Sequence, residues 1–128
     1  MKSIIAVRLL FVVAALYDGI LGLAFLFGAE AVFERFNVPP PNHFGYVHFP
    51  ACLLVVFGIM FLTIAAAPVR NRNLILYGVL LKVSYCSVVF YHWTTAGIPG
   101  MWKPFAFCDL LFIALFVAAF FRLFQEPK

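Results

Sequence analysis

Charged side chains are scarce in this sequence: aspartate, glutamate, lysine and arginine together make up 11% of its 128 residues. An average soluble domain is about 25% charged, so these few residues cannot cover a surface that faces water. Apolar residues supply 66% of the chain, and phenylalanine alone occurs 17 times. The composition therefore predicts one domain, residues 1–128, that is embedded in a membrane.

Two further absences narrow the function. The three cysteines, Cys52, Cys86 and Cys108, form no CxxC pair, so the thioredoxin-like motif and the zinc ribbon are both missing. No basic run interleaved with aromatic residues is present, and we expect no nucleic-acid partner. No residue can be assigned as catalytic, which favours a binding or structural protein over an enzyme.

Four apolar segments can be recognised along the chain. They cover residues 4–27, 49–67, 74–93 and 104–121. Each is close to the roughly 20 residues that an α-helix needs to cross a hydrocarbon layer about 30 Å thick. Backbone groups in lipid must be paired within their own segment. The sequence therefore predicts an all-α fold, a four-helix transmembrane bundle.

The connection between the first and second segments is the longest. Its first part, AEAVFERFNV, places three apolar side chains on one side at helical spacing, namely Val32, Phe33 and Phe36. This pattern predicts a short amphipathic helix lying at the membrane interface. Three prolines, 39–41, then end it, and residues 42–48 have the aromatic and polar character of a belt at headgroup level.

The first segment can also be interpreted as a signal peptide. Lys2 supplies a basic start, and residues 29–31 (Ala-Glu-Ala) resemble a cleavage site. The apolar region is longer than the usual 7–15 residues, however, and Asp18 interrupts it. We therefore expect this segment to be a membrane span.

Lysine and arginine are distributed unequally between the two sides. Six cations fall on one side and two on the other. The six are Lys2, Arg8, Arg70, Arg72, Arg122 and Lys128, and the two are Arg35 and Lys103. The positive-inside rule then predicts that both termini are cytoplasmic, in a bacterial inner membrane. Anionic lipid headgroups are the natural partner for these charges.

Three ionisable residues lie inside the predicted spans: Asp18 in the first, Lys82 in the third and Asp109 in the fourth. A lone ammonium in hydrocarbon costs about 2.5–3.5 kcal/mol by insertion scales. At ~1.5 Å per residue the three lie roughly 14, 16 and 8 Å below the outer surface, and a lysine stem can reach along the bundle. We expect them to meet. One cation facing two carboxylates favours a bound proton or a second cation.

Other polar residues fall near the same depth. In the third span, one helical face carries Lys82, Tyr85, Cys86, Val89, His92 and Trp93. Tyr17 precedes Asp18, and His48 lies near the outer end of the second span. The candidate ligand-binding set is Lys82, Asp18, Asp109, Tyr85, Tyr17, His92 and His48. A purely structural role for the charges remains an alternative to this interpretation.

The two histidines raise the question of a cofactor. His48 and His92 lie at similar predicted depth on different spans, and paired histidines across a bundle can hold haem or a metal. Two ligands are too few for a structural zinc site, and no carboxylate stands beside either at ligand spacing. We assign no metal and no cofactor, and hydrogen bonding at the interface is the simpler interpretation.

The layout resembles the small four-helix membrane proteins grouped as DoxX-like. The resemblance depends on Arg8 opening the first span, on YDGILGLAFLFG (residues 17–28), on AEAVFERFNVPP (residues 29–40) and on the arginine-bearing loop before the third span. It implies a four-helix membrane fold. It also implies a link to membrane oxidoreductase or quinone-associated complexes, because some members of that family have one.

The leading hypothesis is an accessory or ligand-binding membrane protein, with a polar pocket that receives a quinone-like or lipid-like molecule. The alternatives are a structural subunit of a larger membrane complex, and a redox subunit with a histidine-ligated cofactor. The expected partners are membrane lipid, a hydrophobic small molecule, and other membrane proteins or further copies of this chain.

Overall fold

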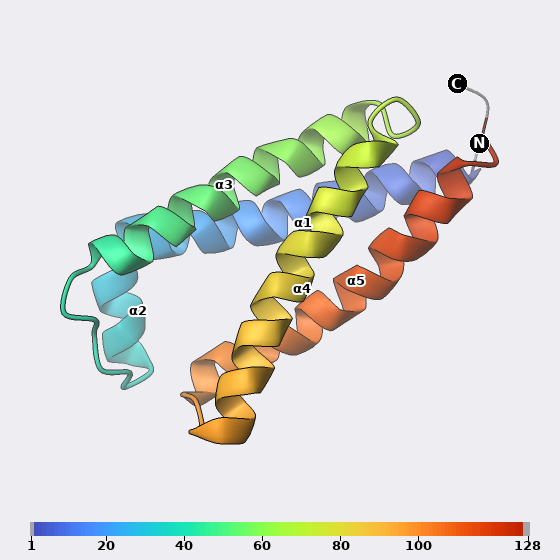
Figure 1. Cartoon of the computed structure of the whole chain (residues 1–128). Coiled ribbons are helices and arrows are strands. Elements are labelled where there is room, and N and C mark those ends of the chain that lie inside the picture. The colour runs from blue at the N-terminus through green and yellow to red at the C-terminus, as the bar shows by residue number, and fades with distance from the viewer. Residues whose placement is uncertain (1, 127–128) are drawn as a thin grey trace.

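The structure, a computed structural model, describes residues 2–126. Lys128, one of the six cations counted above, lies outside the described residues. The helices are α1 (Lys2–Phe27), α2 (Ala29–Arg35), α3 (Gly45–Ala66), α4 (Arg72–Thr95) and α5 (Lys103–Leu123), with a 3₁₀ turn, η1 (Gly100–Trp102), before α5 (Figure 1). Four of them, α1, α3, α4 and α5, are long and apolar enough to cross a membrane. The predicted fold is confirmed, and the protein is an integral membrane protein.

All four spanning helices are longer than the apolar segments that predicted them. Helix α4 extends two residues beyond each end of the predicted span. Helix α3 begins at Gly45, so residues 45–48, predicted as part of an interfacial belt, form its first turn instead. Hydropathy marks where side chains leave the hydrocarbon. The helical hydrogen bonds continue past that level because nothing in the headgroup region interrupts them.

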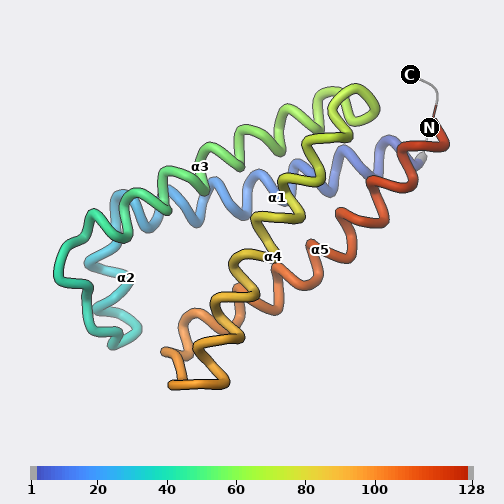
Figure 2. Tube along the Cα trace, viewed as in Figure 1, coloured from blue at the N-terminus to red at the C-terminus, as the bar shows by residue number. Residues whose placement is uncertain are grey.

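The spanning helices form two pairs. Figures 1 and 2 show α1 lying along α3 and α4 lying along α5, each pair antiparallel. The pairs meet at the end that carries both termini and diverge toward the other end. Arg122 Nε donates a hydrogen bond to Ser3 Oγ at 2.9 Å and so joins the two ends of the chain. The shared core contains fully buried phenylalanines from three helices, Phe11, Phe61 and Phe116.

Glycine permits the close approach of α1 and α3. A Cβ atom added to Gly22 would lie 2.7 Å from the backbone oxygen of Ala51. A Cβ atom on Gly58 would lie 3.3 Å from the Cα of Gly19. Small residues at such a contact let two backbones pack directly, which drives helix association in lipid.

Helix α2 lies at the end opposite the termini and confirms the predicted short helix. It buries Ala29 and Phe33, and the Phe33 ring packs near Phe25 and Trp102 with centroids 6.3 and 6.1 Å away. Phe36, predicted on the same apolar side, is 57% exposed on the protein, as expected of an apolar side chain that faces the membrane interface.

Candidate functional site

Asp18 of α1, Lys82 of α4 and Asp109 of α5 meet inside the bundle, as predicted. Lys82 Nζ donates hydrogen bonds to both carboxylate oxygens of Asp18, at 2.8 and 2.9 Å. It also lies 2.9 Å from Asp109 Oδ1, a distance typical of an ion pair, although that contact lacks the alignment of a hydrogen bond. Lys82 and Asp18 are each 1% exposed and Asp109 is 6% exposed. We call these three residues the charge cluster.

The cluster joins the two helix pairs, because Asp18 belongs to one pair and the other two residues belong to the second. Lys82 turns inward because the buried positions of α4 recur every three or four residues. Those positions are Ile75, Gly78, Lys82, Cys86 and Val89. The four-carbon stem of lysine spans the difference in depth between the two carboxylates.

Aromatic rings enclose the ammonium on its remaining sides. Lys82 Nζ lies 5.0 Å from the ring centroid of Tyr17, 4.9 Å from that of Phe112 and 5.9 Å from that of Phe61. Ring faces attract cations, more strongly where water is excluded. Sequence reasoning missed both phenylalanines. Phe112 follows Asp109 by three residues, so helical spacing could have identified it, whereas Phe61 lies in an uncharged span with no such signal.

The cluster is not balanced in charge or in hydrogen bonds. One ammonium faces two carboxylates, and all three are removed from water. Asp109 Oδ1 and the Tyr17 hydroxyl are buried without a hydrogen-bond partner among residues 2–126. Buried polar atoms without partners are rare in proteins. The arrangement can therefore accept a proton or a further polar group without breaking the two bonds to Asp18.

Tyr85 lies one turn from Lys82 on α4, but it contacts the segment before α5 rather than the charge cluster. Its hydroxyl donates a hydrogen bond to the backbone oxygen of Trp102 at 2.9 Å. Cys86 Sγ approaches the backbone oxygen of Ala106 at 3.4 Å. The first contact ties α4 to η1 and the second ties it to the beginning of α5, which carries Asp109. Tyr85 thus supports the site through the backbone that carries it.

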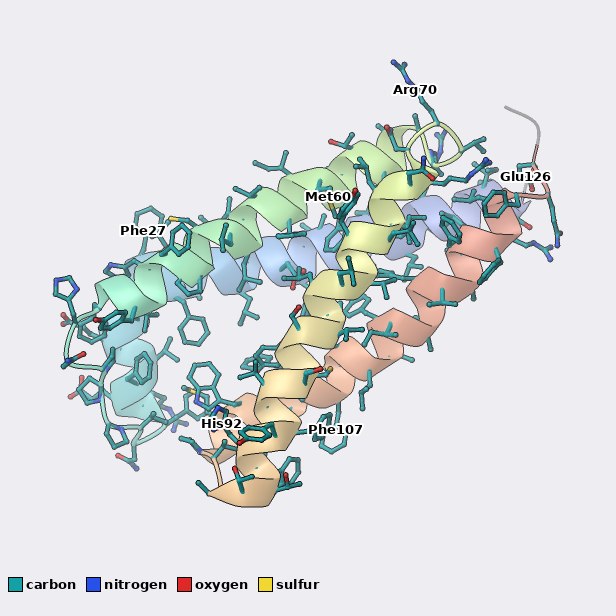
Figure 3. All side chains as sticks on the ribbon, in the orientation of Figure 1. Phe27, Met60, Arg70, His92, Phe107 and Glu126 are labelled. Carbon is teal, nitrogen blue, oxygen red and sulfur yellow. The ribbon has the colours of Figure 1, made fainter. Side chains whose placement is uncertain are left out.

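The structure brings neither histidine to the cluster. His92, predicted on the inward face, is exposed and lies against Tyr91 with ring centroids 5.2 Å apart. It follows Lys82 by ten residues, and at about 100° per residue it has rotated about 80° away. His48 is exposed in the first turn of α3 and stacks on Phe44. Figure 3 places His92 at the far end of α4, away from the beginning of α3 seen in Figure 1.

Within residues 2–126, no three histidine, cysteine or acidic side chains gather in an arrangement that could hold a metal ion. Two hollows lie elsewhere on the described part of the chain. One, of ≈ 540 Å³, lies beside α2 and has Glu30, Glu34 and His48 in its lining. The other, of ≈ 410 Å³, lies at the α3–α4 turn. Neither is lined by the charge cluster, so a molecule that reaches the cluster must displace side chains that cover it.

A scan against protein-family models, a search of curated proteins and a search of solved structures each found no match for this chain. The resemblance to the DoxX-like proteins therefore stays a prediction.

Proposed function

We propose that this protein is an accessory membrane protein that binds the polar head of a quinone-like or lipid-like molecule at the charge cluster. The observation that carries the proposal is the buried Tyr17 hydroxyl, which has no hydrogen-bond partner among residues 2–126 and lies in a cluster where one ammonium faces two carboxylates. An unpaired buried polar atom costs about 1–3 kcal/mol. A bound carbonyl or hydroxyl group would recover part of that cost.

Each side chain has a role in this proposal. Asp18 holds Lys82 in place through two aligned hydrogen bonds. The Tyr17 hydroxyl is a donor for a carbonyl oxygen of the bound head. Asp109 Oδ1 is an acceptor for a hydroxyl group. Phe61 and Phe112 provide apolar surface against the ring or chain of the molecule, as expected of a site that is mostly apolar with a few convergent polar groups.

The test compares what the purified full chain retains in mild detergent. Native mass spectrometry and organic extraction would be applied to the wild type, to Lys82→Met and to Lys103→Met. Lys103 is the matched control, because it lies at the start of α5 with its Nζ 4.5 Å from the Trp93 ring. We expect a small molecule that is present in the wild type and the control and lost from Lys82→Met. Identical extracts from all three would contradict the proposal.

Tyr17→Phe gives a second test that leaves the three charges in place. Loss of one hydrogen bond of about 1 kcal/mol weakens binding about fivefold. A short-chain quinone added to the purified protein is the probe, and bound quinone is measured by native mass spectrometry. Equal binding by the wild type and Tyr17→Phe would remove the hydroxyl from the site.

One observation favours a second function, a structural subunit of a larger membrane complex. The three charged side chains are almost completely buried and connect both helix pairs. Under this alternative, Asp18→Asn and Lys82→Met change stability or assembly, and the wild type retains no small molecule. The same native mass spectra report both outcomes, since they record bound molecules and stoichiometry together.

The association, the membrane and the orientation predicted from the sequence are part of the same proposal. The DoxX-like resemblance supports a quinone-associated role, because some members of that family are linked to such complexes. The excess of lysine and arginine on one side supports a bacterial inner membrane with both termini in the cytoplasm. Cysteine labelling from either side of the membrane, at a position added to each terminus, tests the orientation.

A further inference from the structure

The end of the bundle that carries both termini is basic, and its arginines lack acidic partners. Four arginines lie at this end, and Glu126 is the one carboxylate there among residues 2–126. They are Arg8, Arg70, Arg72 and Arg122. Among residues 2–126, none of these arginines has a carboxylate oxygen within salt-bridge distance. The ion pairs in that range are the two made by Lys82. At the opposite end the charges balance, with Glu30 and Glu34 against Arg35 and Lys103.

Two of these arginines line a single hollow. The hollow at the α3–α4 turn is lined by Val69, Arg70, Arg72 and Asn73 and has a volume of ≈ 410 Å³. The Arg72 guanidinium lies 4.0 Å from the ring centroid of Phe124, which orients it. Arg70 is exposed, and its side chain extends away from the turn in Figure 3. One oriented guanidinium and one that projects from the turn therefore flank the same space.

The position of this turn places the hollow at the level of lipid headgroups. It joins two helices that cross the membrane, α3 ending at Ala66 and α4 beginning at Arg72. In the next turn of α4, Leu76 and Tyr77 are exposed apolar side chains. An acyl chain can lie along them while its headgroup occupies the hollow. Guanidinium groups bind phosphate oxygens through paired, charge-assisted hydrogen bonds.

We propose that the hollow at the α3–α4 turn binds the phosphate of an anionic phospholipid, with Arg70 and Arg72 as its ligands. A lipid fits better than free phosphate because exposed apolar side chains of α4, Leu76 and Tyr77, lie one turn beyond the arginine and asparagine that line the hollow. An anionic lipid fits better than a zwitterionic one because the zwitterionic headgroup would bring its ammonium close to the guanidinium groups of Arg70 and Arg72. The site is separate from the charge cluster and does not depend on the function proposed for it.

The test uses the purified full chain in mild detergent with two probes, phosphatidylglycerol and phosphatidylcholine of the same acyl chains. Native mass spectrometry counts the bound lipids. We expect the wild type to prefer phosphatidylglycerol and Arg70→Gln/Arg72→Gln to bind it roughly thirty-fold more weakly, about fivefold for each arginine. Arg35→Gln makes the same charge change at the opposite end and should bind phosphatidylglycerol as the wild type does.

The single variant Arg70→Gln separates a loss of lipid binding from a folding defect. Arg70 is exposed, whereas Arg72 contacts Phe124 and its replacement could also disturb the fold. Arg70→Gln should weaken phosphatidylglycerol binding about fivefold, and added salt should weaken wild-type binding further. Equal binding of the two lipids by the wild type would overturn the proposal, and so would an Arg35→Gln defect as large as that of the double variant. Inorganic phosphate that binds as tightly as the lipid would overturn the assignment to a lipid.

Discussion

Replacing Lys82 with methionine should destabilise the protein strongly, because the change leaves two buried carboxylates without their cation. Methionine has a similar length and is apolar, so lost packing contributes little. Removing one partner of a buried ion pair costs about 3–5 kcal/mol. Lys82 and Asp18 are each 1% exposed, so water cannot take over the role of the ammonium. We therefore expect a loss of about 3–5 kcal/mol in the free energy of unfolding.

The geometry also predicts that the two carboxylates are unequal. Asp18 receives two aligned hydrogen bonds from Lys82, and a bond to a charged group contributes about 1.5–3 kcal/mol. Asp109 lies as close but without that alignment. In double-mutant cycles with Asp18→Asn and Asp109→Asn, Lys82→Met should couple more strongly to Asp18. Removing all three charges together should restore part of the stability that Lys82→Met loses.

The assay is reversible unfolding in mixed micelles of dodecyl maltoside and SDS, followed by helical circular dichroism. Lys103→Met is the control, and its cation–π contact with Trp93 predicts a loss below about 1 kcal/mol. The reasoning is refuted if Lys82→Met lies within about 1 kcal/mol of the wild type, well under the expected cost. It is also refuted if Lys82 couples to Asp109 as strongly as to Asp18.

Two further predictions follow from close contacts. Gly22→Ala should lower the free energy of unfolding by about 1–3 kcal/mol, because the new Cβ would lie 2.7 Å from the backbone oxygen of Ala51. Gly19→Ala is its matched control, since a Cβ there meets nothing within 4 Å, and an equal loss would contradict the packing argument. Tyr85→Phe should lose about 1 kcal/mol with the hydrogen bond to the Trp102 oxygen, and the same unfolding assay would show no change if that bond is unimportant.

The meeting of Asp18, Lys82 and Asp109 could be predicted because membrane depth is nearly one-dimensional. Residue number along a spanning helix gives depth directly, and an unpaired charge in hydrocarbon is too costly to leave alone. The sequence determines the rotation of each helix about its axis less closely than it determines depth. For that reason the inward position predicted for His92 was wrong. A drift of about 80° over ten residues is invisible to a pattern that tolerates spacings of three and four.

The sequence by itself determined that this is a four-span membrane protein with a cation and two acids inside, because hydropathy and the cost of buried charge are properties of the residues alone. Only the tertiary structure decided which contacts result. It divided the helices into two pairs, placed Phe61 and Phe112 around the ammonium, aligned Asp18 but not Asp109, and left the Tyr17 hydroxyl without a partner. Those outcomes depend on how helices from distant parts of the chain rotate and cross, which is set by the fit of side chains between them.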